Sequence, residues 1–111
     1  MSVRFKAALA AQSVLAAALL AFSSVGQADE KFELGKKVFT SQAMPACTIC
    51  HTLQDAGSAG TIGPNLDELK PTPERVSTAV KGGIGVMPAF AALSAEQVEA
   101  VAYYVAKAAN K

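Results

Sequence analysis

The sequence has 111 residues, of which 51% are hydrophobic, 6% aromatic and 17% charged, and its 10 Lys and Arg against 9 Asp and Glu give a formal net charge of +1. A nucleic-acid binder would show a basic stripe, a disordered chain would hold fewer apolar residues, and a second ordinary domain would need more length. The composition therefore favours a single small globular domain.

The apolar residues concentrate near the N-terminus. Arg4 and Lys6 precede a long, almost wholly apolar stretch, and small residues lead up to Ala28. This is the pattern of a secretory signal peptide, although an uncleaved membrane anchor has a similar span. The alanine-rich stretch and the small-residue site favour cleavage after Ala28. We therefore predict a signal peptide over residues 1–28 and one domain over residues 29–111 that is exported to the periplasm.

The first element of the exported domain is predicted to be a helix. Residues Lys31 to Thr40 mix charged and apolar side chains in the manner of a short amphipathic helix. Gly35 and Phe39 lie four positions apart, so they share one face of that helix.

Two cysteines and the single histidine come next. Domains of this size often rely on a disulfide, a metal or a cofactor. A disulfide between Cys47 and Cys50 would close a loop of almost no length and would stabilise little. His51 follows directly, and Cys-x-x-Cys-His is the attachment pattern of c-type haem, with two thioether bonds and an imidazole on the iron. The segment therefore predicts one covalently bound haem c.

Two other uses of this cysteine pair are weaker. A thiol-disulfide oxidoreductase would place the pair at the start of a helix after a strand, and no strand alternation precedes Cys47. A structural zinc site needs four ligands, whereas the chain clusters only two cysteines and one histidine.

The segment after the motif is predicted to be a loop over Gly57 to Gly63. An axial imidazole normally donates its other N–H to a carbonyl or carboxylate. The Pro64 carbonyl is a candidate acceptor for His51, because Gly63 allows a close approach. A simple turn before a helix explains the same residues equally well.

Two helical segments follow. Leu66 to Lys70 is predicted to form one helical turn, ended by the proline behind it. Thr72 is a candidate N-cap with Pro73 in the first helical position. That helix is predicted to run to about Val80 and to stop at Gly82-Gly83.

A methionine is the candidate for the second axial position, since His51 is the only histidine. Met87 stands in a glycine-rich segment that can run close to a flat ring, and Pro88 stiffens it. Met44 lies three residues before Cys47, beside the attachment site. We predict Met87 as the ligand, with Met44 or an open position as the alternatives.

The last predicted element is a helix that begins after Ser94. Gln97, three residues later, completes a capping box, and an apolar stripe continues toward the C-terminus. Tyr103 and Tyr104 are predicted to pack rather than to do chemistry.

These motifs, in this order, resemble the small class I cytochromes c of bacteria. The resemblance covers residues 29–111 and implies an all-α fold of a few short helices around one haem. It implies that the terminal helices cross near the haem, with Gly35 and Phe39 meeting Tyr103 and Tyr104. Unlike the mitochondrial members, this chain has no Trp to bond a haem propionate. The motifs that carry the resemblance are Cys47-Thr48-Ile49-Cys50-His51, Gly63-Pro64-Asn65-Leu66 and Gly85-Val86-Met87-Pro88-Ala89-Phe90.

The family pattern also implies the site. The Pro64 carbonyl is expected to accept from His51, and Met87 is expected to be the distal ligand. The expected iron ligands are His51 and Met87. The full set of expected cofactor-binding residues is Cys47, Cys50, His51, Pro64 and Met87.

The expected function is one-electron transport in the periplasm rather than catalysis. The protein would act as a free carrier or as the cytochrome subunit of an oxidoreductase such as a sulfite dehydrogenase. Partners would be redox proteins, with a periplasmic dehydrogenase as donor and a terminal oxidase or another cytochrome as acceptor. No nucleic acid, and no membrane after cleavage, is expected as a partner. A haem enzyme with an open distal site and a thiol-disulfide oxidoreductase remain alternatives. The expected docking surface at the haem edge comprises Met44, Pro45, Ala46, Ile49, Val86 and Pro88.

Overall fold

The computed structural model describes residues 26–111. The chain divides into two compact units, Met1–Glu30 and Lys31–Lys111. The predicted signal peptide lies almost entirely outside the described residues. Residues 26–30, the described part of the first unit, are helical. Within residues 26–111, no helix combines the length and the apolar character needed to cross a bilayer. The second unit holds every residue predicted to bind the cofactor.

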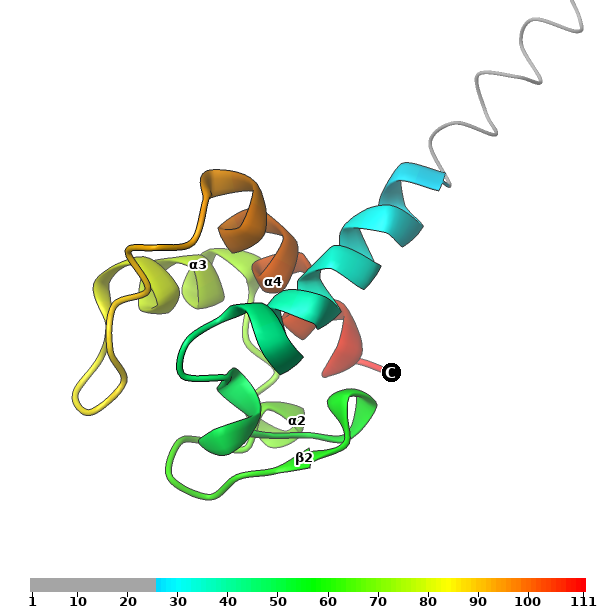
Figure 1. The fold of residues 1–111 in the computed structure, drawn as a ribbon. Helices are drawn as coiled ribbons and strands as arrows, with labels where there is room; N and C mark the ends of the chain where they lie inside the picture. The colour runs from blue at the N-terminus through cyan, green and yellow to red at the C-terminus, as the bar shows by residue number, and fades with distance from the viewer. Residues whose placement is uncertain (1–25) are drawn as a thin grey trace, which may run out of the picture. The chain divides into compact units, whose positions relative to one another are not determined.

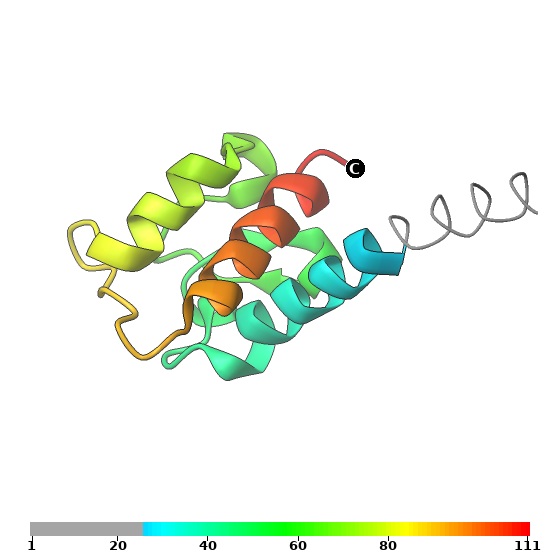
Figure 2. The ribbon, with the colours of Figure 1, turned by 90° about the horizontal axis from the view of Figure 1, so that it is seen from above.

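Helices frame the second unit (Figure 1). Residues 31–37 are α-helical and lead into a π-helical turn, η1 (Val38–Gln42). We call residues 31–42 the first helix. It ends two residues beyond the predicted end at Thr40. The other long helices are α3 (Pro73–Gly82) and α4 (Ala95–Ala108). Seen from above, α4 lies between α3 and the first helix (Figure 2). The family expectation of a mainly helical fold is confirmed.

Short elements occupy the chain between η1 and α3. The expectation that residues 57–63 form only a loop is wrong, because two residues of it pair with the segment after the histidine. Thr52 pairs with Ala59 and Leu53 with Ser58 in an antiparallel register. The left-handed Gly57, at φ 66°, makes the reversal between them. The short elements are η2 (Cys47–Ile49), β1 (Thr52–Leu53), η3 (Gln54–Ala56), β2 (Ser58–Ala59) and α2 (Leu66–Leu69).

The predicted helix caps are confirmed. The Thr72 hydroxyl accepts from a backbone N–H of the first turn of α3, and Pro73 is the first helical residue. The helix continues two residues beyond the predicted end, and Gly83 follows as its C-cap. Ser94 and Gln97 form both bonds of the capping box at the start of α4. Local rules therefore placed the beginning of both helices correctly.

The first helix and α4 touch at a glycine. A Cβ on Gly35 would overlap the carbonyl oxygen of Ala100 and the Cβ of Tyr104, so only glycine fits there. Phe39 packs edge-on against Tyr104, with ring centroids 5.8 Å apart. The expected meeting with Tyr104 is therefore confirmed, whereas Tyr103 lies instead beneath the amines of two lysines.

A polar cluster ties three parts of the domain together; we call Asp55, Tyr104, Lys36 and Lys111 the Asp55 cluster. The buried Tyr104 donates its hydroxyl to Asp55 at 2.7 Å, and the Lys111 ammonium lies 2.8 Å from the other carboxylate oxygen. Lys36 approaches to 3.5 Å. The hydrogen bond from Lys111 is the largest cause that lowers the pKa of Asp55, while burial and then the Asp55 hydrogen bond raise the pKa of Tyr104.

Candidate functional site

The Cys-x-x-Cys-His motif folds into one tight turn. Cys47 begins the 3-10 helix η2, and its carbonyl accepts from the backbone N–H of Cys50 at 3.2 Å and of His51 at 3.0 Å. Because a 3-10 turn brings residues three positions apart onto one side, the two thiols lie on the same side of the chain. All three side chains line a single cavity.

The ring of His51 is fixed from behind. Its Nδ1 lies 2.8 Å from the Pro64 carbonyl oxygen, which can only accept, so Nδ1 carries the proton. This tautomer leaves the lone pair of Nε2 free to bind a metal. Gly63 makes the arrangement possible, because a Cβ there would stand 2.6 Å from the ring carbon Cε1. The Gly63-Pro64 pair thus sets both the orientation and the tautomer.

The cavity itself is large and apolar. Its volume is about 390 Å³, within the range typical of small-molecule and cofactor sites. Among residues 26–111, the polar side chains on its wall are Cys47, Cys50, His51 and Arg75. The first helix, α2, α3 and α4 supply part of the apolar wall, through Phe39, Leu66, Leu69, Val76, Ala79, Val80, Val101 and Val105.

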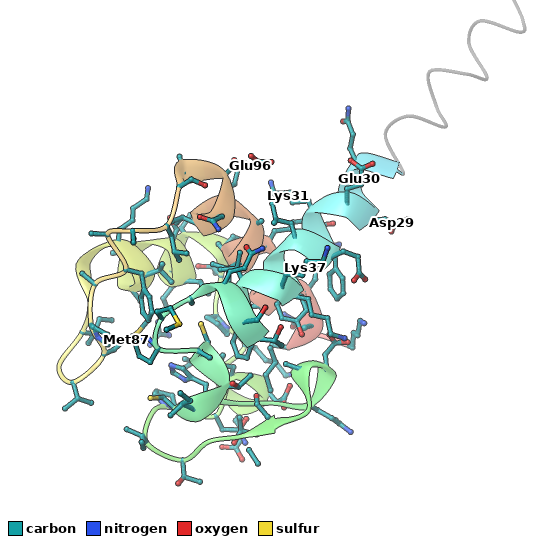
Figure 3. The ribbon with its side chains drawn as sticks, viewed as in Figure 1. Asp29, Glu30, Lys31, Lys37, Met87 and Glu96 are labelled. Carbon is teal, nitrogen blue, oxygen red and sulfur yellow. The ribbon has the colours of Figure 1, made fainter. Side chains whose placement is uncertain are left out.

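Met87 lies on the loop that follows α3 (Figure 3). Ile84 and Met87 exchange both backbone hydrogen bonds, at 3.0 and 2.9 Å, and Gly85 turns the chain between them at φ 56°. The Phe90 N–H bonds the Val80 carbonyl at 2.8 Å, which holds the loop against α3. Met87 is partly buried and lines the cavity. A stiff loop of this kind would lose little freedom if its thioether bound a metal.

Met44 occupies a different environment. Its side chain is 84% exposed and is not part of the cavity wall. The structure thus brings Cys47, Cys50, His51, Pro64 and Met87 around one cavity and leaves Met44 outside it.

The residues present fit a covalent haem. A flat apolar macrocycle needs an apolar slot, two thiols at its edge and a nitrogen donor for the iron, and the cavity has each of these. The Cys47 thiol is a poor candidate for redox exchange, because burial, opposed in part by a backbone hydrogen bond, raises its pKa to about 11. Reactive thiols have lowered pKa values instead.

Sequence analysis missed Arg75. It lies on α3 and lines the cavity together with Val76 and Ala79. The local sequence shows only that Arg75 precedes Ala79 by four residues and so shares its helix face. That face could be assigned to the cavity only once the packing of α3 was known.

Fold and site together define a small helical protein built to hold one covalently attached haem. A family model described as "Cytochrome C oxidase, cbb3-type, subunit III" matches residues 30–105. The crystal structure of the c-type cytochrome SorU from Sinorhizobium meliloti is 53% identical, with a TM-score of 0.73, over 75% of this chain and 95% of that one. No curated protein sequence matches the chain significantly.

The chain therefore belongs to the c-type cytochrome family that this model describes. Its cofactor is covalently bound haem c, and the family assigns it to electron transfer rather than to catalysis.

Proposed function

We propose that this cytochrome is a one-electron carrier whose iron is held by His51 on one side and by Met87 on the other. The observation that carries the proposal is that both side chains line the same cavity. The Nδ1–H of His51 is bonded to the Pro64 carbonyl, so Nε2 is the nitrogen left for the iron. When bound, haem c supplies an iron that cycles between the ferric and ferrous states. With both axial positions filled by the chain, a substrate has no access to the metal.

Each remaining part of the site has a role in this proposal. Cys47 and Cys50 form the two thioether bonds, and Gly63 and Pro64 orient His51. The apolar wall excludes water, which disfavours the additional positive charge of the oxidised state and raises the reduction potential. A methionine thioether acts in the same direction.

Carbon monoxide binding to the reduced protein tests the axial ligands. Wild type should bind none, because both positions are occupied. Met87→Ala should bind it readily, whereas Met44→Ala, which alters an exposed methionine outside the cavity, should behave as wild type. Carbon monoxide binding by wild type would contradict the proposal and favour a haem enzyme with an open distal site.

The proposed location is the periplasm, reached by means of a signal peptide over residues 1–28. The support is the positive, apolar and small-residue pattern of that segment. N-terminal sequencing of the protein from a periplasmic fraction should begin at Asp29. Full-length protein in the membrane fraction would contradict cleavage.

The proposed docking surface is an apolar rim around the cavity mouth. Val86 is 86% exposed and Ile84 65%, and both also line the cavity. Among the described residues, no acidic side chain lines the cavity, and the rim itself carries no charge. The partner is therefore proposed to be a redox protein with an equally uncharged, apolar face, such as a periplasmic dehydrogenase, a terminal oxidase or another cytochrome. We define the apolar rim as Ile62, Ile84 and Val86, the exposed large apolar side chains that also line the cavity.

Val86→Glu tests this surface, because it places a charge in the apolar rim. The second-order rate of electron transfer with the periplasmic partner, isolated by pull-down on wild type, should fall at least tenfold, because a charge must be desolvated on docking. Thr78→Glu adds the same charge to an exposed position on α3 outside the rim and should leave the rate unchanged. Equal rates for all three proteins would exclude the rim as the docking surface.

A further inference from the structure

Arg75 has no counter-ion within the described residues. Of the residues that the structure describes, it is the one permanently charged side chain on the cavity wall. The carboxylates that form ion pairs among residues 26–111 are Asp55 and Glu99, and lysines pair with both. The Arg75 side chain makes no hydrogen bond to any residue of this part of the chain. A cation thus stands at an apolar cavity without a partner from the described chain.

The cofactor brings the missing anions. Haem c carries two propionate carboxylates, and the wall offers few groups to receive them. The other polar side chains there are Cys47, Cys50 and His51, which the proposed function commits to the thioether bonds and to the iron. The chain has no Trp whose indole N–H might serve instead. Arg75 is therefore the only side-chain donor on the wall that remains for a carboxylate.

We infer that Arg75 holds one haem propionate through a charge-assisted pair. The planar guanidinium presents two parallel N–H groups that match a carboxylate, and Arg75, although its side chain is exposed to solvent, stands on the cavity wall. Arg75 is then a positioning residue that fixes one edge of the ring and neutralises one of its negative charges. The inference rests on the proposed placement of haem in this cavity.

Two measurable consequences follow. The wall provides one guanidinium for two carboxylates, so only one propionate should respond when Arg75 is changed. A positive charge near the ring also disfavours the ferric state, which carries one more positive charge than the ferrous state. Removal of Arg75 should therefore shift the redox equilibrium toward the oxidised protein.

Arginine-selective ¹⁵N labelling tests the pair in the unmodified holoprotein. The sequence contains only Arg4 and Arg75, and Arg4 lies in the predicted signal peptide. The processed protein should therefore give one Nε–H resonance. Pairing with the propionate should slow its exchange with water well below that of free arginine under the same conditions. Exchange at the rate of free arginine would overturn the inference.

Variants provide the second test. Redox-induced infrared difference spectra of Arg75→Gln should show a displaced band for one propionate carboxylate. Its equilibrium with a fixed redox couple should shift about three- to tenfold toward the oxidised form. Arg75→Lys, which keeps the charge, should restore most of the equilibrium shift. Lys81→Gln removes an exposed charge from the same helix, away from the cavity wall, and should change the equilibrium less than twofold.

The outcomes separate this inference from the proposed function. If wild type shows the absorption spectrum of covalent haem and excludes carbon monoxide, the proposed function stands. Carboxylate bands of Arg75→Gln that superimpose on those of wild type would then overturn the Arg75 assignment alone. A colourless wild-type protein would remove the basis of both.

Discussion

The Asp55 cluster and the cavity are linked by two aromatic residues, Tyr104 and Phe39. The two regions differ in whether their polar groups find partners within the chain. In the Asp55 cluster every charged group has its partner within the chain, at 2.7 to 3.5 Å. In the cavity, the thiols, one nitrogen of His51, the Met87 thioether and Arg75 all lack such partners among the described residues. One side of the domain is held by its own side chains, and the other is the side that we propose the haem completes.

Tyr104 stands between the two regions. Its ring packs against Phe32 at 4.9 Å and against Phe39 at 5.8 Å, and Phe39 in turn lines the cavity. Its hydroxyl belongs to the Asp55 cluster. A change that moves Tyr104 should therefore disturb both regions, whereas changes elsewhere should affect only one.

Gly35→Val should have the largest effect. The new side chain overlaps the α4 backbone at Ala100 and the Cβ of Tyr104, so the first helix must move away. We expect a loss of about 3 kcal/mol or more in the free energy of unfolding, measured by denaturant titration of the holoprotein. Gly82→Ala is the matched control, because a Cβ there meets nothing within 4 Å. Equal stability of the two variants would contradict the close contact.

Gly63→Ala should affect mainly the cavity. Its Cβ would crowd the His51 ring and push it away from the orientation that Pro64 fixes. We expect a loss of about 2 kcal/mol, together with a changed absorption spectrum of the reduced protein. An unchanged spectrum would show that His51 tolerates the added methyl group.

Asp55→Asn should affect mainly the polar side, by about 2 kcal/mol at neutral pH, with the haem spectrum unchanged. The pKa of Asp55 is lowered in the folded state, chiefly by the hydrogen bond from Lys111. Its contribution is therefore complete above the ordinary carboxyl pKa and disappears as the pH falls through the folded pKa. Denaturant titrations from pH 7 to pH 2 should show the unfolding free energies of wild type and Asp55→Asn converging at the acidic end. A constant difference would contradict the ion pairing.

Ser94→Ala should have the smallest effect and should touch neither region. It removes the hydroxyl that accepts from the Gln97 N–H, which costs about 1 kcal/mol at a helix N-cap. Thermal unfolding should show a small decrease in Tm, with unchanged absorption. A change in carbon monoxide binding would mean that the start of α4 also controls the cavity.

The parts of the fold that sequence predicted are those set by neighbouring residues. Thr72, Pro73, Ser94 and Gln97 act within one helical turn, so their chemistry marks the helix starts directly. The haem motif is equally local, because Cys47 to His51 form a single turn. Local sequence made Pro64 and Met87 candidate partners of the His51 site, and the family resemblance implied that these residues meet around one cofactor.

The parts that sequence missed depend on distant contacts or on very short elements. The pairing of β1 with β2 involves two residues on each side, too few to show a period of two. Asp55 meets Tyr104 and Lys111 across 49 and 56 positions, and nothing in the local sequence marks that meeting. Arg75 was overlooked for the same reason, because its face of α3 is defined by what α3 packs against.

Lys70 shows how a backbone preference and a side-chain tether can oppose each other. Lys70 adopts left-handed backbone geometry at φ 47°, a conformation that costs less free energy for glycine than for lysine. Its ammonium donates to the Ala109 carbonyl at the end of α4, 2.7 Å away. Lys70→Gly would relieve the torsional strain and release the tether together. Overall stability would then change little, while amide hydrogen exchange in the last turn of α4 would accelerate.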